Sequence, residues 1–363
     1  MKAKRDSNID SLRILSILLI IAFHFVYHGS FGISSTDIYA SFAGKIVYHF
    51  GELGTSCFVL ISGYYLERTS FKPRKVILFV LEIEFYVVIS KIILWAFGTP
   101  VNWEMLDFFP LFANEYWFIH VYLLIYCLQP FLKKVLTPLD QKQLQMLIWG
   151  QVLIWSVIPT VAYSSLFKGS TESMPYYNRY IWFLNVYIIG YYLQKYPVPF
   201  PKNDFLHLAD AKKWMVLILP FELLILFILT GERGLWPFSA TFFWRPNSLL
   251  MLWMSVALFI AFRDWKPLKH KKYIEIAAST TLGIYLLHDG ELRPFLWRDL
   301  FQIGENVNLL EFLGWLILVT GIVFIVGMIV DLGRQFLEKI ILIPAVRAIQ
   351  QRIIGRGKSI CNI

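Results

Sequence analysis

Residues 8–28 read NIDSLRILSILLIIAFHFVYH, and the rest of the chain can be interpreted around this segment. From Leu12 to Tyr27 it is almost wholly apolar, which predicts a helix that crosses a membrane. Arg13 and His24 interrupt the apolar run, and their spacing of eleven residues places both on nearly the same helix face. At about 1.5 Å per residue they lie roughly 16 Å apart along the axis, about half of a ~30 Å hydrocarbon core.

Two interpretations of Arg13 and His24 are open. Arg13 can extend to the lipid headgroups while His24 hydrogen-bonds a neighbouring helix, and for Arg13 by itself this structural interpretation is favoured. Ionisable groups inside a span are costly, however, and usually face a protein interior or a wet cavity. The shared face of the two residues favours a functional pair.

The composition is that of an all-α, polytopic membrane protein. Of 363 residues, 57% are hydrophobic and only 16% charged, whereas soluble domains carry about 25% charged residues. The net charge of +9 does not indicate nucleic acid binding, because the basic residues cluster in short loops between apolar runs. The three cysteines lack metal-ligand spacing, and we predict neither a disulfide framework nor a bound metal.

Ten apolar runs are long enough to be spans, and they predict one transmembrane bundle over residues 1–332. With the N-terminus inside, 25 of the 34 Lys and Arg residues fall in cytoplasmic segments and five in external loops, which predicts two cytoplasmic termini. Residues 333–363 read as a basic, amphipathic cytoplasmic tail, interrupted near Pro344. The expected spans are 10–28, 42–66, 76–97, 115–133, 144–163, 180–194, 214–230, 241–262, 273–290 and 312–332.

The second expected span contains HFGELGTSCFVLISGYYL, residues 49–66. Its small residues predict close helix packing rather than chemistry. His49 and Glu52, three residues apart, either form a polar pair near the outer mouth of the bundle or serve packing alone. The small residues are Gly51, Gly54, Ser56, Ser62 and Gly63.

Three further segments give the chain a family resemblance. The Arg–ten residues–His spacing of the first span, followed by FVLISGYYL at 58–66, resembles the bacterial acyltransferase-3 family of integral membrane acyltransferases. Residues 115–132, EYWFIHVYLLIYCLQPFL, and residues 279–288, STTLGIYLLH, resemble two later family segments in the expected order. The resemblance covers essentially the whole chain, but Glu52 departs from it, because the family more often has apolar residues there.

The resemblance implies transfer of an acyl group from cytoplasmic acyl-CoA to a hydroxyl of an extracytoplasmic or lipid-linked glycan. We then expect Arg13 to hold a CoA phosphate through its planar cation. His24 would meet the thioester, either as general base or as the carrier of the acyl group. We expect the transferred group to be acetyl and the acceptor to be a cell-envelope or exported polysaccharide. The protein should lie in a bacterial plasma membrane, surrounded by membrane lipids, and should hold no permanently bound cofactor.

A second group of polar and aromatic residues is predicted to contribute to substrate binding near the external helix ends. His288 closes the ninth expected span with Tyr285 one turn earlier, whereas the adjacent Asp289 should point elsewhere on a continuous helix. Arg245 either holds an acidic sugar or anchors the membrane interface. The candidates are His288, Tyr285, Glu52, His49, Trp117 and Arg245.

A transporter or flippase of a glycan or lipid-linked intermediate is the main alternative function. Polar residues on one helix face would then line a pathway instead of a reaction centre. The sequence shows no inverted repeat and no paired broken helices, which such proteins often have. A sensor or scaffold is a third, more distant possibility. Consumption of a thioester by the purified protein separates the enzyme from both.

Overall fold

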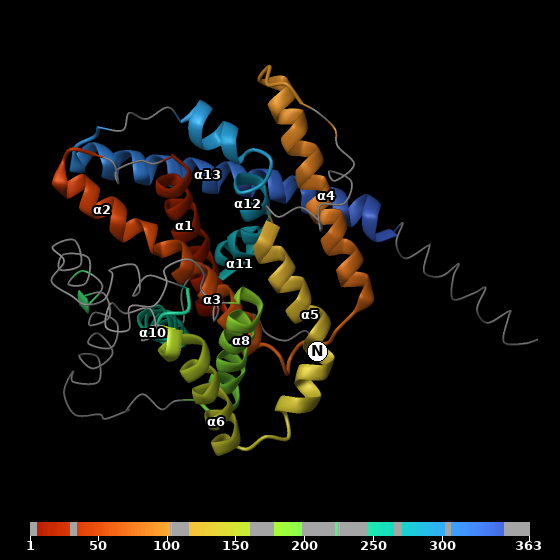
Figure 1. Cartoon of the computed structure of the whole chain (residues 1–363). Helices are drawn as coiled ribbons and strands as arrows, with labels where there is room; N and C mark the ends of the chain where they lie inside the picture. Colours follow the sequence, from red (N-terminus) through yellow and green to blue (C-terminus); the bar gives the residue numbers. More distant parts are fainter. Residues whose placement is uncertain are drawn as a thin grey trace, which may run out of the picture.

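The computed structural model describes residues 6–29, 35–101, 103, 116–159, 178–197, 222–223, 225, 246–264, 271–301 and 306–344. All regular structure within these residues is helical, as predicted (Figure 1). The helices are α1 (Ser7–Gly29), α2 (Ile38–Tyr48), α3 (Phe50–Tyr64), α4 (Pro73–Ala96), α5 (Trp117–Leu136), α6 (Gln141–Val152), η4 (Leu153–Val157), α8 (Arg179–Lys195), α10 (Leu249–Asp264), α11 (Lys271–Ser279), α12 (Thr281–His288), η7 (Phe295–Leu300), α13 (Leu309–Leu337) and η8 (Glu338–Leu342).

Four helical stretches of the described residues are long and apolar enough to cross a membrane. They are Ser7–Gly29, Ile38–Tyr64, Trp117–Leu136 and Leu309–Ile341. The predicted membrane character is therefore confirmed, whereas the count of ten spans stays a prediction. The span expected at 214–230 falls almost wholly outside the described residues.

Two of the expected spans differ from single continuous helices. The span expected at 42–66 is divided at His49, whose backbone N–H donates to the Ile46 carbonyl at 3.1 Å in a tightened turn between α2 and α3. The span expected at 273–290 is divided at Thr280, between α11 and α12. The hydroxyls of Thr280 and Thr281 donate to carbonyls three residues earlier, and such bonds compete with regular helix geometry.

Helix α1 lies at the centre of the bundle. It packs against α2, α3, α10, α11, α12 and α13, so helices from both ends of the sequence surround it (Figure 1). Its apolar side chains Leu12, Ile17, Ile21, Phe25 and Val26 are completely buried. Burial of each such side chain contributes about 1.5–3 kcal/mol in water, and within a membrane the same contacts supply the van der Waals packing between helices. This packing places Arg13 and His24 inside the protein.

The glycines of α3 serve helix packing, as predicted. A Cβ on Gly63 would collide with the Tyr187 carbonyl of α8, and a Cβ on Gly190 of α8 would collide with the Leu60 carbonyl of α3. A Cβ on Gly54 would reach the Ser16 carbonyl of α1. The three backbones approach this closely only because these positions lack a side chain.

A buried ion-pair network joins α4 to α13. The Arg334 guanidinium contacts Asp331 at 2.6 Å, Glu338 at 2.7 Å and, across the helices, Glu82 at 2.9 Å. The Tyr86 hydroxyl donates to Asp331 at 2.7 Å. Helix α13 therefore runs without a break through residue 332, where the transmembrane domain was predicted to end, because buried partners on α4 continue the packing.

The topology can be tested with reporter fusions. Because basic residues favour the cytoplasmic side, fusions in the loops near Asn102 and Glu305 should report an external location. A fusion near Lys271 should report an internal location. The measurement is the activity of a phosphatase and a fluorescent reporter at each site. An inverted pattern would put Arg13 on the side away from cytoplasmic CoA, and would contradict the function proposed below.

Candidate active site

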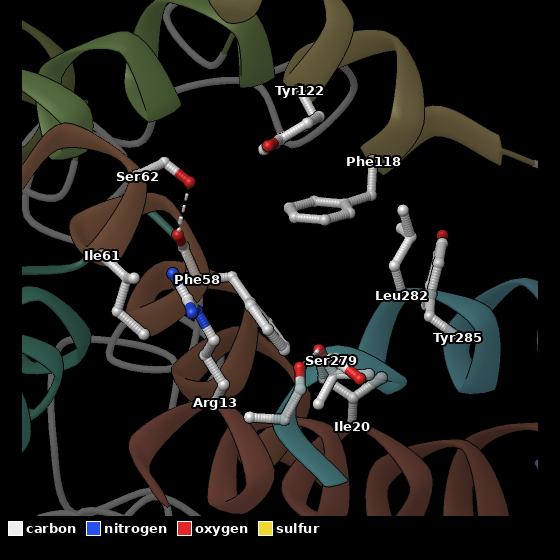
Figure 2. Close-up of a pocket in the computed structure, with 12 residues that line it drawn as sticks. Arg13, Ile20, Phe58, Ile61, Ser62, Phe118, Tyr122, Ser279, Leu282 and Tyr285 are labelled. Atoms are coloured by element: carbon white, nitrogen blue, oxygen red, sulfur yellow. Dashed lines mark hydrogen bonds between the residues drawn. The ribbon is translucent and has the colours of Figure 1, made fainter. Parts of the chain in front are cut away.

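A cavity of about 280 Å³ opens beside α1. Figure 2 shows side chains from α1, α3, α5, α11 and α12 around it, with Arg13 on one side and Tyr285 on the other. Its walls are mainly apolar and aromatic, with a few hydroxyl groups. The lining residues are Arg13, Ile20, Phe58, Ile61, Ser62, Phe118, Tyr122, Ala278, Ser279, Thr281, Leu282 and Tyr285.

Arg13 contributes the positive charge of this cavity. One guanidinium nitrogen, Nη1, donates to Asp10 at 2.7 Å, one turn earlier on α1. The guanidinium carbon lies 5.8 Å from the centre of the Tyr65 ring. The side chain is 28% exposed, and Arg13 lines the cavity. A guanidinium has five N–H donors, so one bond to Asp10 leaves donors for an anionic ligand.

Two histidines from opposite ends of the chain form a buried hydrogen bond. Nδ1 of His24 lies 3.0 Å from Nε2 of His288, and Nδ1 of His288 lies 2.6 Å from the Ile284 carbonyl. The carbonyl can only accept, so Nδ1 of His288 carries a proton. With His288 neutral, its Nε2 accepts the Nδ1 proton of His24. This network assigns the lone pair of His24 to Nε2.

Asp289 faces this lone pair. Its Oδ1 lies 3.6 Å from Nε2 of His24 and 3.5 Å from Nε2 of His28. Asp289 was expected to point away from the His288 side of a continuous helix, and this expectation is wrong. Helix α12 ends at His288, and Asp289 leaves helical geometry (φ −110°, ψ 6°). His28 was not predicted, although its position four residues after His24 on one helix face was a signal.

Tyr285 connects the cavity with the histidines. It lines the cavity, and its ring lies 6.1 Å from that of His288 and 5.8 Å from that of Phe118. The structure thus brings together Arg13, Tyr285, His288 and His24 along one side of α1, although α1 and α12 lie far apart in the sequence.

The other candidates lie away from the cavity or cannot be placed. Trp117 begins α5, where the Arg179 guanidinium lies 4.5 Å from its ring centre. His49 is buried at the junction of α2 and α3, and Glu52 lies in the first turn of α3. None of these three is among the described residues that line the cavity. Arg245 lies outside the described residues.

The chain was also compared with known proteins. Comparison with curated proteins and with solved structures gave no match. A family model described as an acyltransferase domain matches residues 6–331, a range that includes the cavity, His24 and His288. The chain therefore belongs to the acyltransferase-3 family and is a membrane acyltransferase.

Proposed function

We propose that this protein transfers an acyl group, acetyl in the simplest case, from cytoplasmic acyl-CoA to a hydroxyl of a cell-envelope or exported polysaccharide. The observation that carries the proposal is the cavity that leads from Arg13 to Tyr285, beside the His24–His288 pair. A cationic entrance followed by an apolar passage suits a phosphate-bearing donor with a long, largely uncharged arm that ends in a thioester.

In this mechanism Arg13 binds a CoA phosphate, and the thioester lies near His24. Nε2 of His24 removes the proton of the acceptor hydroxyl, and the oxygen attacks the thioester carbonyl carbon. The carbon–sulfur bond breaks, an ester forms, and the CoA thiolate takes the proton from His24. Asp289 stabilises the intermediate imidazolium, since its carboxylate lies 3.6 Å from Nε2.

We favour His24 as general base over His24 as acyl carrier, because the base route moves fewer protons. Loss of the Nδ1 proton would be needed to form a neutral acyl-imidazole. In the carrier route that proton would pass to Nε2 of His288 and leave His288 as a buried cation, while its Nδ1 proton stays bonded to the Ile284 carbonyl. The base route keeps the Nδ1 proton in place throughout.

Purified protein supplies the direct test. With acetyl-CoA and de-acetylated envelope polysaccharide, free CoA thiol should be released and ester groups should appear on the glycan in equal amounts. Mass spectrometry of surface glycans from cells with and without the protein identifies the acceptor. Absence of thiol release, the result expected for a transporter or flippase, would contradict the proposal.

His288 is expected to act as a positioning residue. His288→Phe removes the acceptor for Nδ1 of His24 while it keeps a ring of similar size. The turnover number should fall about tenfold, the scale of one lost hydrogen bond, with the KM for acyl-CoA nearly unchanged. His288→Gln keeps an acceptor and should restore part of the rate. A change in KM alone would instead indicate a structural role.

A further inference from the structure

The proposed base, His24, forms a cluster with two other possible metal ligands, His28 and Asp289. His24, His28 and Asp289 each offer one ligand atom, and these three atoms lie within 4.8 Å of one another. Nε2 of each histidine faces Oδ1 of Asp289. The transfer reaction gives His28 no step and uses Asp289 only through its charge. We propose that these three residues form a Zn²⁺ site, and that Zn²⁺ bound there inhibits acyl transfer. The inhibitory part rests on the function proposed above, whereas the binding site does not.

The distances fit a tetrahedral ion. Zn²⁺ binds histidine nitrogen at about 2.0–2.1 Å and carboxylate oxygen at about 2.0–2.2 Å, so two ligands lie about 3.3–3.5 Å apart. Oδ1 of Asp289 lies 3.6 Å from Nε2 of His24 and 3.5 Å from Nε2 of His28. The two histidines are four residues apart on α1, the spacing that places two zinc-binding histidines on one helix face.

The carboxylate oxygen is buried without a hydrogen bond. The Asp289 side chain is 5% exposed, and no described residue donates a hydrogen bond to its Oδ1. Buried charges are costly unless they are paired or coordinate a metal. The Arg293 guanidinium faces this carboxylate at 3.8 Å, and a metal ion held by the two histidines would lie much closer to Oδ1, at about 2.0–2.2 Å. The metal ion would also lie between Oδ1 of Asp289 and the Nε2 lone pair of His24, which face each other when no ion is bound.

The histidine pair supplies the outer support that metal sites usually have. A zinc-binding histidine donates its other ring N–H to an acceptor, which sets its tautomer and orientation. The Nδ1 proton of His24 is directed to His288 in this way, and His288 is held by the Ile284 carbonyl. His24 is therefore already in the tautomer that binds a metal through Nε2.

Arg293 opposes metal binding. Its Nη1 lies 3.8 Å from Oδ1 of Asp289, and its positive charge repels a second cation at the same carboxylate. The Arg293 side chain is 29% exposed, so it can turn away when the ion enters. The His28 side chain is 18% exposed and gives the site a route to solvent. Removal of the Arg293 charge should therefore strengthen Zn²⁺ binding.

Inhibition is expected because the metal binds the nitrogen atom that acts as the base. Zn²⁺ on Nε2 of His24 blocks the lone pair that accepts the hydroxyl proton. The cavity that receives acyl-CoA does not include His28 or Asp289 among its described lining residues. Zn²⁺ should therefore lower the turnover number and leave the KM for acyl-CoA unchanged.

The test uses the full chain, purified in lipid nanodiscs after treatment with a chelator. Because Cys127 is exposed and thiolates bind zinc, Cys127 and Cys361 are changed to Ser in all samples. Zn²⁺ binding is measured by equilibrium dialysis and by X-ray absorption spectroscopy. One ion per chain with nitrogen and oxygen ligands at about 2.0 Å is expected. His28→Ala and Asp289→Asn should each weaken binding about tenfold or more.

Two matched variants make the result specific. His120→Gln removes a histidine of α5 outside the cluster and should leave Zn²⁺ binding unchanged. Arg293→Gln should tighten binding, a gain that a misfolded protein would not show. Equal affinity in all variants would mean that zinc binds elsewhere, and the proposed site would be wrong. Binding without inhibition would overturn the inhibitory role, and absence of binding would overturn the site while the transfer reaction itself is unaffected.

Discussion

Replacement of His24 with alanine is expected to abolish acyl transfer while acyl-CoA binding stays near normal. The imidazole is proposed to act on the proton of the acceptor hydroxyl, and loss of such a base typically costs about 10²–10⁴-fold in rate. His24 contacts His288 and Asp289 but is not among the described residues that line the cavity proposed to receive the donor. Thiol release measures the rate, and isothermal titration with a non-hydrolysable acyl-CoA analogue measures binding.

His24→Gln is the matched control for a structural histidine. Glutamine keeps hydrogen-bonding groups and much of the volume, so it should preserve folding without restoring activity. A histidine that only joins α1 to α12 would behave in the opposite way, because glutamine could replace that contact. Substantial transfer by the Gln variant would therefore contradict both chemical roles of His24.

The base and carrier routes can be separated with labelled acyl-CoA in the absence of acceptor. A general base leaves the protein unlabelled, because no covalent bond to His24 forms at any step. An acyl carrier accumulates label on the His24 imidazole, which rapid quenching and peptide mass spectrometry would detect. We expect no label, since the base route keeps the Nδ1 proton of His24 in its bond to His288.

Arg13→Lys is expected to weaken acyl-CoA binding by about 1.5–3 kcal/mol, the range for a hydrogen bond to a charged group. Lysine keeps the charge but loses the planar, two-pronged contact that suits phosphate. The Kd for acyl-CoA should therefore rise roughly 10- to 150-fold, as measured by isothermal titration. The transfer rate at saturating acyl-CoA should change much less.

Arg68→Lys provides the control for this substitution. Arg68 also lies beside aromatic rings, with its guanidinium carbon 5.7 Å from the Tyr65 ring centre, but it is not among the described residues that line the cavity. Its replacement should leave CoA affinity unchanged. If Arg13→Lys binds acyl-CoA as tightly as the wild type in a well-folded protein, Arg13 serves only the membrane interface.

Local patterns in the sequence determined the elements of the fold. The length and apolarity of residues 12–27 predict α1, and Asp140, Asn178 and Asn308 cap the helices that follow them. The glycines of α3 likewise predict close packing, because a missing side chain is a local property with one main structural use. The Arg13–His24 spacing predicts a shared face, since the helical period relates residues within one helix.

Only the tertiary structure decided which residues meet across helices. The His24–His288 contact joins positions 264 residues apart, and no periodicity within α1 or α12 encodes which faces pack together. Asp289 reaches His24 and His28 because α12 ends one residue earlier, and the segment by itself does not encode which side chains it then meets. The sequence alone thus predicted the helical class and α1, and named His24 and Arg13 as candidates. Packing decided that His28, His288 and Asp289 gather around the His24 imidazole, because contacts between distant segments follow from the complementarity of whole helix faces.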